Sequence, residues 1–298
     1  MDGNGINRNQ INWYPGHMNK ARIMMEESIR LVDLLIEITD ARAPLSSRNP
    51  DIDRLGKGKV RVIILNKSDL ADRELNKRWL AYFSDRGMEA LLMDSKGRNG
   101  IKSVMPAVIR ACEDKISRNR ARGIVNTSLK AMVVGIPNVG KSTFINAFVG
   151  RNATLTGNKP GVTKGKQWIS VNKELELLDT PGILWPKFED QEVGKKLAFL
   201  GSINDEILVA EELAGDLLIF LYREYPGLLE ERYKITPDVV EADPGASFST
   251  PQSRMLFHIA KNRGCLKKGG EVDYFKTAGI VMDDFRSGRI GSITLERP

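Results

Sequence analysis

The sequence predicts an α/β domain, with a mostly parallel sheet covered by helices on both faces, followed by a smaller all-helical domain. Up to about residue 180, short apolar runs alternate with amphipathic stretches, which is the order of a parallel sheet with crossover helices. From about Gln191 onward the apolar residues follow a helical period instead. We therefore expect two domains, 1–186 and 187–298.

Each element follows from its own pattern of apolar residues. Buried strands are expected at 31–41, 59–66, 89–94, 129–136, 166–171 and 175–179. Helices are expected at 18–32, 72–87, 101–116, 141–150, 191–201, 205–226, 251–264 and 272–288. Pro106 must lie near the first turn of its helix or bend it, because proline lacks the amide hydrogen that a helix interior needs.

Composition indicates a globular protein of the reducing cytoplasm. Hydrophobic residues make up 41% of the 298 and charged residues 28%, and no apolar run approaches the length of a membrane span. The first residues lack the basic start and apolar core of a signal peptide. Cys112 and Cys265 match no metal-ligand spacing, so we interpret them as buried thiols.

The positive charge is modest in amount but is gathered into three runs. Lys and Arg number 45 against 38 acidic residues, for a net charge of +7. The runs lie at 115–123, 159–166 and 261–270. One such run alone is best explained as a solvated surface, but three together favour an RNA or DNA partner.

The segment 135–142, GIPNVGKS, fits the phosphate-binding pattern G-x-x-x-x-G-K-[ST]. It follows an apolar strand and opens a helix, so a chance Lys-Ser after a glycine turn is an improbable alternative. Lys141 would reach the β- and γ-phosphates, and Ser142 would coordinate Mg²⁺. The residues expected to bind phosphate are Asn138, Val139, Gly140, Lys141, Ser142 and Thr143.

A second motif, D-T-P-G, ends the strand predicted at 175–179. Asp179 would belong to the outer shell of the Mg²⁺ ion, and the amide of Gly182 would meet the γ-phosphate. Between the two motifs, Thr163 is the best candidate for a hydroxyl that reaches Mg²⁺ when the γ-phosphate is present. D-x-x-G alone is often only a turn, but behind a phosphate-binding loop it indicates a nucleotide site.

The base is predicted to be guanine. N-K-S-D ends the strand predicted at 59–66, and the carboxylate of Asp69 would accept the two hydrogens that guanine offers and adenine lacks. Asn66 would contact the other side of the base, and the Lys67 stem would pack on the ring. D-S-K-G ends the next strand, where the amide of Ser95 or Lys96 would meet guanine O6.

These motifs resemble those of the translation-factor-related GTPases, but their order is circularly permuted. N-K-S-D and D-S-K precede the phosphate-binding loop, and D-T-P-G comes last. Together with W-Y-P-G-H-M near the start, this order resembles the ribosome biogenesis GTPase A (YlqF/RbgA) family. The resemblance implies a circularly permuted P-loop GTPase domain, GTP or GDP with Mg²⁺, and a precursor of the large ribosomal subunit, with its rRNA, as the partner.

His17 is the candidate for assisting the attacking water. Ile183 stands where Ras-like GTPases carry a glutamine, and an apolar side chain cannot hydrogen-bond water. From sequence alone, a helix cap or packing under Trp13 is the favoured explanation of His17. The missing glutamine and the family resemblance, which implicates this histidine in hydrolysis, reverse that preference. The predicted catalytic residues are therefore His17, Lys141 and Thr163. For Asn138, K⁺ binding, as in related GTPases, and an ordinary loop position are near even.

The helical domain carries no cluster of catalytic residues. Its basic run 261–270 suits a phosphate backbone, and the resemblance supplies the rRNA of the large subunit as the partner. We expect a monomer that does not bind membranes. Two rival functions are a GTPase signalling switch with a protein partner and no RNA role, which the basic runs disfavour, and a P-loop ATPase or kinase, which N-K-S-D disfavours.

Overall fold

A computed structural model gives the arrangement of most of the chain. It describes residues 16–124, 128–150, 167–180, 182, 184–185, 190–203, 209–241 and 250–298, and it describes the side chains in these ranges except those of 16–22 and 167. The predicted residues Thr163 and Ile183 and the basic run 159–166 lie outside this description. Helix α1 begins at Gly16, so His17 lies in its first turn, but its side chain is not described.

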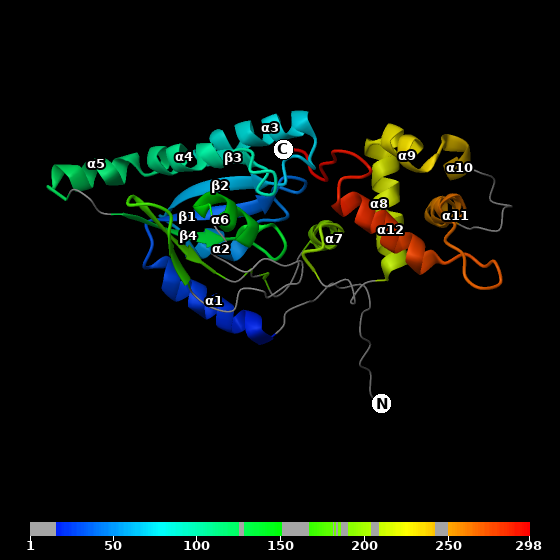
Figure 1. Cartoon of the computed structure of the whole chain (residues 1–298), viewed down its shortest axis with the longest axis horizontal. Coiled ribbons are helices and arrows are strands. Elements are labelled where there is room, and N and C mark those ends of the chain that lie inside the picture. Colours follow the sequence, from blue (N-terminus) through cyan, green and yellow to red (C-terminus); the bar gives the residue numbers. More distant parts are fainter. Residues whose placement is uncertain are drawn as a thin grey trace. The chain divides into compact units, whose positions relative to one another are not determined.

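A six-stranded sheet forms the centre of the first part of the chain (Figure 1). Its order is β3-β2-β1-β4-β6-β5, and every neighbouring pair is parallel except β5 with β6. The strands are β1 (Leu34–Asp40), β2 (Val60–Asn66), β3 (Glu89–Met93), β4 (Leu129–Val134), β5 (Gln167–Ser170) and β6 (Leu175–Asp179). This sheet confirms the predicted mostly parallel α/β fold.

Both faces of the sheet are covered. Leu35 packs with α1 and α2, and Ile63 packs with α3. The register pairs Glu37 with Ile63, and Leu35 lies two residues before Glu37, so these three helices lie on the same face. Residues of opposite parity such as Ile36 and Ile64 are also fully buried. Strands buried on both faces explain the near-continuous apolar runs in the sequence.

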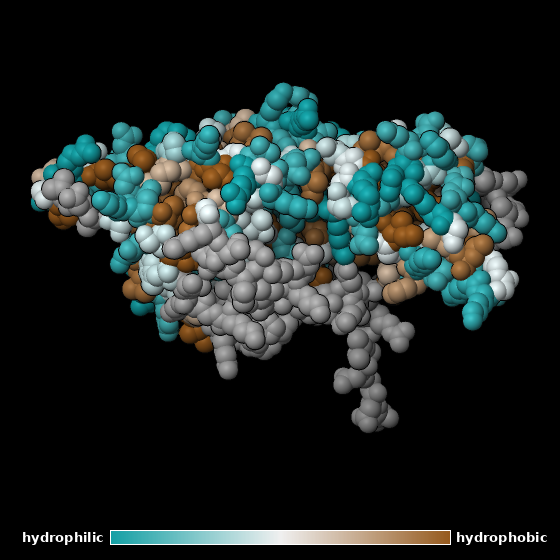
Figure 2. Space-filling view, viewed as in Figure 1, coloured by the Kyte–Doolittle hydropathy of each residue, from teal (hydrophilic) through white to brown (hydrophobic). Residues whose placement is uncertain are grey.

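In helix α3 the spacing of the apolar residues determines which face is buried. Leu75, Trp79 and Phe83 recur at helical spacing and are buried against β2 and β3. The Asp72 side chain caps the first turn by accepting from the amides of Glu74 and Leu75. Hydrophilic residues predominate over this helix in the space-filling view (Figure 2), as its alternating pattern requires.

The helices of the first part otherwise follow the expected positions, with one break. They are α1 (Gly16–Ile29), α2 (Pro50–Leu55), α3 (Arg73–Ser84), a 3₁₀ turn η1 (Ile101–Ser103), α4 (Val104–Ala111), α5 (Glu113–Ala121) and α6 (Lys141–Val149). The single helix expected at 101–116 is wrong. It divides into η1, α4 and α5, because Cys112 adopts φ −100° and ψ 9° and ends α4. Pro106 lies in the first turn of α4, as predicted.

The second part is helical, as expected. Its elements are α7 (Gln191–Phe199), α8 (Ala210–Glu224), α9 (Pro226–Tyr233), α10 (Pro237–Glu241), α11 (Pro251–Arg263) and α12 (Tyr274–Arg286). Helix α8 packs against α9, α11 and α12 (Figure 1). Arg286 donates to the carbonyls of Ala198 and Phe199, which end α7. Helices α9 and α10 were not predicted. Both begin at a proline, Pro226 or Pro237, which sequence reasoning takes for a stop.

The chain divides into two compact units. The described residues up to 196, together with 294–298, form one, and those between 197 and 293 form the other. The boundary expected between 186 and 187 stays a prediction, because 186–189 lie outside the described residues. The return of 294–298 to the first unit was not foreseen.

Candidate functional site

The loops that carry the predicted motifs meet at one edge of the sheet. In a parallel sheet the carboxyl ends of the strands lie together, and ligands bind outside them. Here β2 ends at N-K-S-D, β3 at D-S-K, β4 at the phosphate-binding loop and β6 at D-T-P-G. Because β4 lies between β1 and β6 in the sheet, motifs that are permuted along the chain are neighbours in space.

The phosphate-binding loop depends on two glycines. Gly140 has φ +94° and Gly135 φ +154°, a region that other residues rarely adopt. A Cβ on Gly140 would lie 2.4 Å from Nδ2 of Asn66, and one on Gly135 would lie 2.5 Å from the carbonyl oxygen of Ile38. Helix α6 then starts at Lys141, so its free amides face the position that phosphates occupy in such loops.

Lys141 is buried beneath this loop, with a relative exposure of 8%. Burial lowers the pKa of Lys141 from its ordinary value of 10.5 to about 8, and the neighbouring carboxylate of Asp179 opposes that shift. Phosphate groups at the same place would favour the charged form, so a ligand of high negative charge suits this lysine.

Asn66 connects three of the loops. Its Nδ2 donates to the carbonyl of Val139 in the phosphate-binding loop at 2.8 Å. Its Oδ1 accepts from the amide of Ser95 at 3.1 Å and from the Ser95 hydroxyl at 2.8 Å. Both ends of the side chain are therefore engaged with protein, and contact with the base itself stays a prediction. This buried residue fixes the base loops relative to the phosphate loop.

Lys67 forms a second connection to the phosphate-binding loop. It donates to the carbonyl of Asn138 at 2.7 Å and pairs with the carboxylate of Asp40 at 2.9 Å. Burial lowers the pKa of Lys67, although Asp40 opposes this. Lys67 and Asn138 both have positive φ, of 58° and 63°, which indicates that the loops hold them in place.

Asp40 and Arg42 belong to this network and were missed from the sequence. Arg42 donates to both carboxylate oxygens of Asp40, from Nε at 2.9 Å and from Nη2 at 2.8 Å. Burial alone would raise the pKa of Asp40, but Arg42 and Lys67 outweigh it and hold that pKa well below its usual range. The signal was an aspartate that ends a buried strand, followed two residues later by arginine.

The two remaining base residues lie toward solvent. Asp69 and Lys96 are exposed, whereas Ser95 is buried. Partial burial and then the charge of Asp94 raise the pKa of Asp69, while Arg42 opposes the rise. An exposed carboxylate next to the buried Asn66–Ser95 pair is arranged to accept hydrogen bonds from a ligand that enters from solvent.

The end of β6 comes close to the phosphate-binding loop. Asp179 is buried, and the Thr180 hydroxyl donates to the carbonyl of Val133 at 2.8 Å. A Cβ on Gly182 would lie 2.9 Å from Nζ of Lys141 and 3.0 Å from the Pro137 nitrogen, so only glycine allows this approach. Asp179 and the half-buried Ser142 offer the carboxylate and hydroxyl oxygens that Mg²⁺ prefers, and the donor set fits that ion.

The structure thus brings together most of the predicted site residues. Those that lie at this edge are Asn66, Lys67, Asp69, Ser95, Lys96, Asn138, Val139, Gly140, Lys141, Ser142, Thr143, Asp179 and Gly182. Thr163 and the His17 side chain lie outside the described residues, so the structure does not place them.

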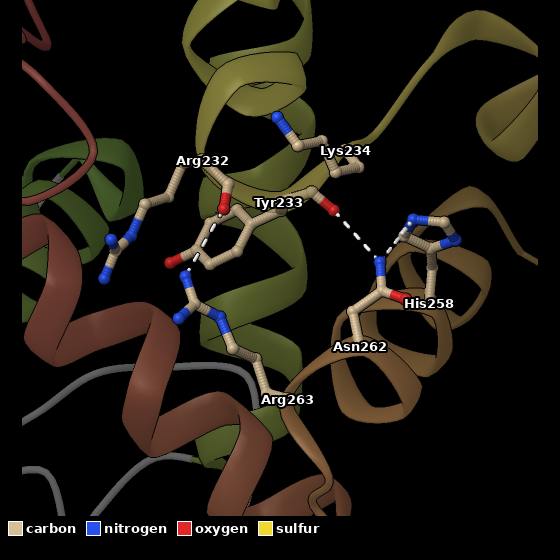
Figure 3. A pocket seen from close by; sticks show the side chains of 6 residues that line it. All are labelled: Arg232, Tyr233, Lys234, His258, Asn262 and Arg263. Carbon is tan, nitrogen blue, oxygen red and sulfur yellow. Dashed lines mark hydrogen bonds between the residues drawn. The ribbon is translucent and has the colours of Figure 1, made fainter.

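A cationic cavity of about 580 Å³ lies in the helical unit (Figure 3). It is lined from the end of α9 and from α11 by Arg232, Tyr233, Lys234, His258, Asn262 and Arg263. Asn262 donates to Nε2 of His258 at 2.9 Å and to the carbonyl of Tyr233 at 3.3 Å.

The cations of this cavity differ in their pairing. Arg232 pairs with Asp284 at 2.8 Å. Lys234 and Arg263 donate only to the backbone carbonyls of Glu231 and Arg232, both at 3.3 Å. Neither forms an ion pair with a carboxylate within the part of the chain that the structure describes. Arg263 also lies over the ring of Tyr233, at 5.6 Å from its centroid. Two cations beside a cavity, without a carboxylate partner in the described ranges, favour an anionic ligand.

Comparison with known proteins agrees with the geometry of the site. Residues 130–241 match a family model described as "50S ribosome-binding GTPase". The chain is 46% identical to "Ribosome biogenesis GTPase A" of Bacillus cereus over 291 residues, which cover 97% of this chain and 94% of that protein. No helix within the described ranges is long and apolar enough to cross a membrane.

Two solved structures are similar along nearly the whole chain. One is the GDP-bound structure of TM YlqF, with a TM-score of 0.65, 25% identity, and coverage of 92% of this chain and 98% of that one. The other is GNP-bound YlqF from T. maritima, with a TM-score of 0.63, 25% identity, and coverage of 94% and 98%.

Proposed function

This chain belongs to the ribosome biogenesis GTPase A family, and we propose that it binds a precursor of the large ribosomal subunit in its GTP state and leaves after hydrolysis. It is a GTPase with a circularly permuted domain, which converts GTP and water into GDP and phosphate. The relatives do not favour the alternative of a signalling switch without an RNA role. Action late in assembly, in the cytoplasm and as a monomer, belongs to the same proposal.

One observation carries the assignment of the nucleotide. The side chain of Asn66 joins the phosphate-binding loop, through the carbonyl of Val139, to the D-S-K loop, through Ser95. The loop predicted to read the base and the loop predicted to hold the phosphates are thus joined by one buried side chain. Asp69, three residues after Asn66, supplies the carboxylate that distinguishes guanine from adenine.

In the reaction, an oxygen–phosphorus bond forms from water to the γ-phosphate, and the bond to the β-phosphate oxygen breaks. The role of the protein is to position these groups and to stabilise the negative charge that they share. Lys141 and the amides that open α6 would hold the phosphates. Ser142 and Asp179 would hold Mg²⁺, which when bound offsets charge on the β- and γ-phosphates.

Three further roles stay proposals. His17 would assist the attacking water, Thr163 would add a hydroxyl to Mg²⁺, and the Gly182 amide would sense the γ-phosphate. The position of Gly182 beside Lys141 supports the last of these. For His17, replacement by alanine should lower particle-stimulated turnover while the affinity for GTP barely changes. Normal stimulated turnover in that variant would remove His17 from the mechanism.

The ionic requirements are testable with the native protein. For Asn138, a role in K⁺ binding predicts faster turnover in K⁺ than in Na⁺ at equal ionic strength. Equal turnover in the two salts would leave Asn138 as a loop residue. For Mg²⁺, a chelator should abolish turnover, and added Mg²⁺ should restore it.

Guanine recognition has a direct test. GTP, but not ATP, should compete for bound labelled GDP, and Asp69→Asn should shift the preference toward xanthosine nucleotides, whose 2-oxo group needs a donor instead of an acceptor. Competition by ATP as strong as that by GTP would contradict the assignment and favour the rival ATPase function.

Ribosomal docking is supported by the cationic cavity of the helical unit, where Lys234 and Arg263 offer charge to an RNA phosphate. Sedimentation with ribosomal particles should show binding with a non-hydrolysable GTP analogue and release with GDP. A pull-down with and without ribonuclease separates RNA from protein partners. Binding that survives ribonuclease and does not depend on the nucleotide would contradict the proposal.

A further inference from the structure

The C-terminal segment returns to the nucleotide-binding unit and is buried there. Thr294 and Leu295 have relative exposures of 3% and 5%. The amide of Leu295 donates to the carbonyl of Arg42 at 2.6 Å. This places the segment directly on the residue that holds Asp40, at the edge of the sheet where the base loops lie.

Glu296 makes the densest contact. Its carboxylate accepts from the amide of Leu45 at 2.8 Å, from the amide of Ser46 at 3.0 Å and from the Ser46 hydroxyl. Lys196 lies 3.5 Å from the same carboxylate. Two backbone amides and a hydroxyl directed at one charged group fix the loop that follows Arg42, because charge-assisted bonds are the strong ones.

Thr294 contacts the other side of the base loop. Its hydroxyl accepts from the amide of Asp72 at 3.0 Å, and Asp72 is the residue whose side chain caps α3. Asp72 lies three residues after Asp69 in the sequence. Thr294 and Glu296 therefore hold both neighbours of the guanine-reading loop, the segment before α3 and the loop after β1.

A continuous series of contacts joins Arg42 to the phosphate-binding loop. Arg42 binds Asp40, Asp40 binds Lys67, and Lys67 donates to the carbonyl of Asn138 in the phosphate-binding loop. The charge of Arg42 also acts on Asp69. A displacement of the loop after Arg42 would thus be felt at the residue that reads the base.

We propose that residues 294–296 are a positioning element of the guanine site, in which Glu296 and Thr294 hold the N-K-S-D loop in its binding geometry. The inference rests on the proposed guanine site. It adds residues that lie far from every GTPase motif in the sequence. The segment also continues from the chain that follows α12, so the helical unit is joined covalently to the base side of the site.

The test compares GDP with IDP, which lacks the 2-amino group that Asp69 reads. Binding of both nucleotides to the full chain is measured by calorimetry. In Glu296→Ala the Kd for GDP should rise about tenfold, and the preference for GDP over IDP should fall several-fold, because the carboxylate of Asp69 is no longer held in place. Glu296→Gln keeps one acceptor oxygen and should restore part of both. Thr294→Val, which keeps the buried shape, should give a smaller loss of about threefold.

The matched control is Glu74→Ala, which removes an exposed carboxylate of α3 whose ion pair among the described residues is with Lys77, and it should change neither constant. Circular dichroism of each nucleotide-free variant monitors folding, and Thr294→Val still tests the proposal if Glu296→Ala fails to fold. Equal losses for GDP and IDP would make the segment merely structural and would overturn the proposal, as would unchanged binding. Absence of any GDP preference in the unaltered protein would overturn the guanine site as well, so the two failures are distinguishable.

Discussion

Each unit of the molecule contains a buried aspartate that pairs with two cationic side chains. The two arrangements differ in how far those side chains are exposed to solvent. Asp40, in the nucleotide-binding unit, binds Arg42 and Lys67, whose side chains are 2% and 26% exposed. Asp284, in the helical unit, binds Arg232 and Arg289, which are 29% and 52% exposed. The carboxylates are equally buried, at 1% and 3%. Arg42 is enclosed, Lys67 and Arg232 are partly exposed to a similar degree, and Arg289 is the most exposed of the four cations.

The same arrangement, an aspartate paired with two cations, therefore serves a different purpose in each unit. An enclosed cation such as Arg42 has a large desolvation cost and tolerates little movement, so it fixes the geometry of loops that must fit one nucleotide. Cations that reach water present charge to a ligand whose exact shape is not specified, such as a phosphate backbone. The first arrangement should be sensitive to substitution and insensitive to salt, and the second should be the reverse.

The largest expected effect comes from removing each carboxylate. Asp40→Ala should lower the free energy of unfolding by about 4 kcal/mol, because it leaves buried cations unpaired. Asp284→Ala should lower it by only about 2 kcal/mol, since Arg232 and Arg289 can turn to solvent. Urea unfolding monitored by hydrogen exchange in each unit measures both. Equal losses would break the comparison.

The next largest effect is the pH dependence of stability that the buried Lys141 causes. Its folded pKa of about 8 lies below the ordinary 10.5, so between these values the unfolded chain binds more protons and stability rises with pH. Without nucleotide, the protein should gain about 2 kcal/mol over this range relative to Lys141→Met. GDP should abolish the gain, because its phosphates keep the lysine charged. Parallel pH profiles of protein and variant would contradict the burial argument.

Substitution of Tyr233 tests the comparison in the helical unit. Its hydroxyl donates to Asp284 at 2.9 Å, and burial, followed by the charge of Asp284, raises the pKa of Tyr233. Tyr233→Phe should therefore lower the free energy of unfolding of the helical unit by about 1.5 kcal/mol. GDP affinity should not change, since no nucleotide loop is touched. A changed GDP affinity would show that the two arrangements are not independent.

The smallest effects should appear at the cavity and depend on salt. Lys234→Ala and Arg263→Ala should each weaken RNA binding about threefold, and each should reduce the slope of log affinity against log salt by about 1. Lys77→Ala, which removes an exposed lysine of α3, is the matched control and should leave the slope unchanged. A slope that neither cavity variant alters would exclude both cations from the RNA contact.

The features that could be predicted from the sequence are those that depend on residues close together in the chain. The strand runs, the phosphate-binding pattern and N-K-S-D each depend on a few adjacent residues, and the structure places Asn66, Lys141 and Asp179 at one edge as expected. Glu296 and Thr294 were missed because their partners, Ser46 and Asp72, are more than two hundred residues away. No periodicity or motif encodes such a contact.

Other omissions have local causes. The break at Cys112 is a change of one backbone angle, which apolar spacing cannot show. Helix α9 begins directly after α8 at Pro226, so a residue that usually stops a helix here starts one. Asp40 was interpreted as the end of a strand, because a buried carboxylate that pairs with Arg42 resembles any polar strand end until the fold brings Lys67 to it.

The permuted order of the sheet also sets the order in which the domain is made. As the chain is synthesised, β1 meets β2 and β3 first, and the loops that follow β2 and β3 carry the residues predicted to read the base. The strand that bears the phosphate-binding loop, β4, is added later on the open side of β1. The predicted base-reading residues are therefore made before the loop that is predicted to hold the phosphates, and before Thr294 and Glu296, which we propose to position them. Nucleotide binding would begin only after β4 has joined this half-sheet.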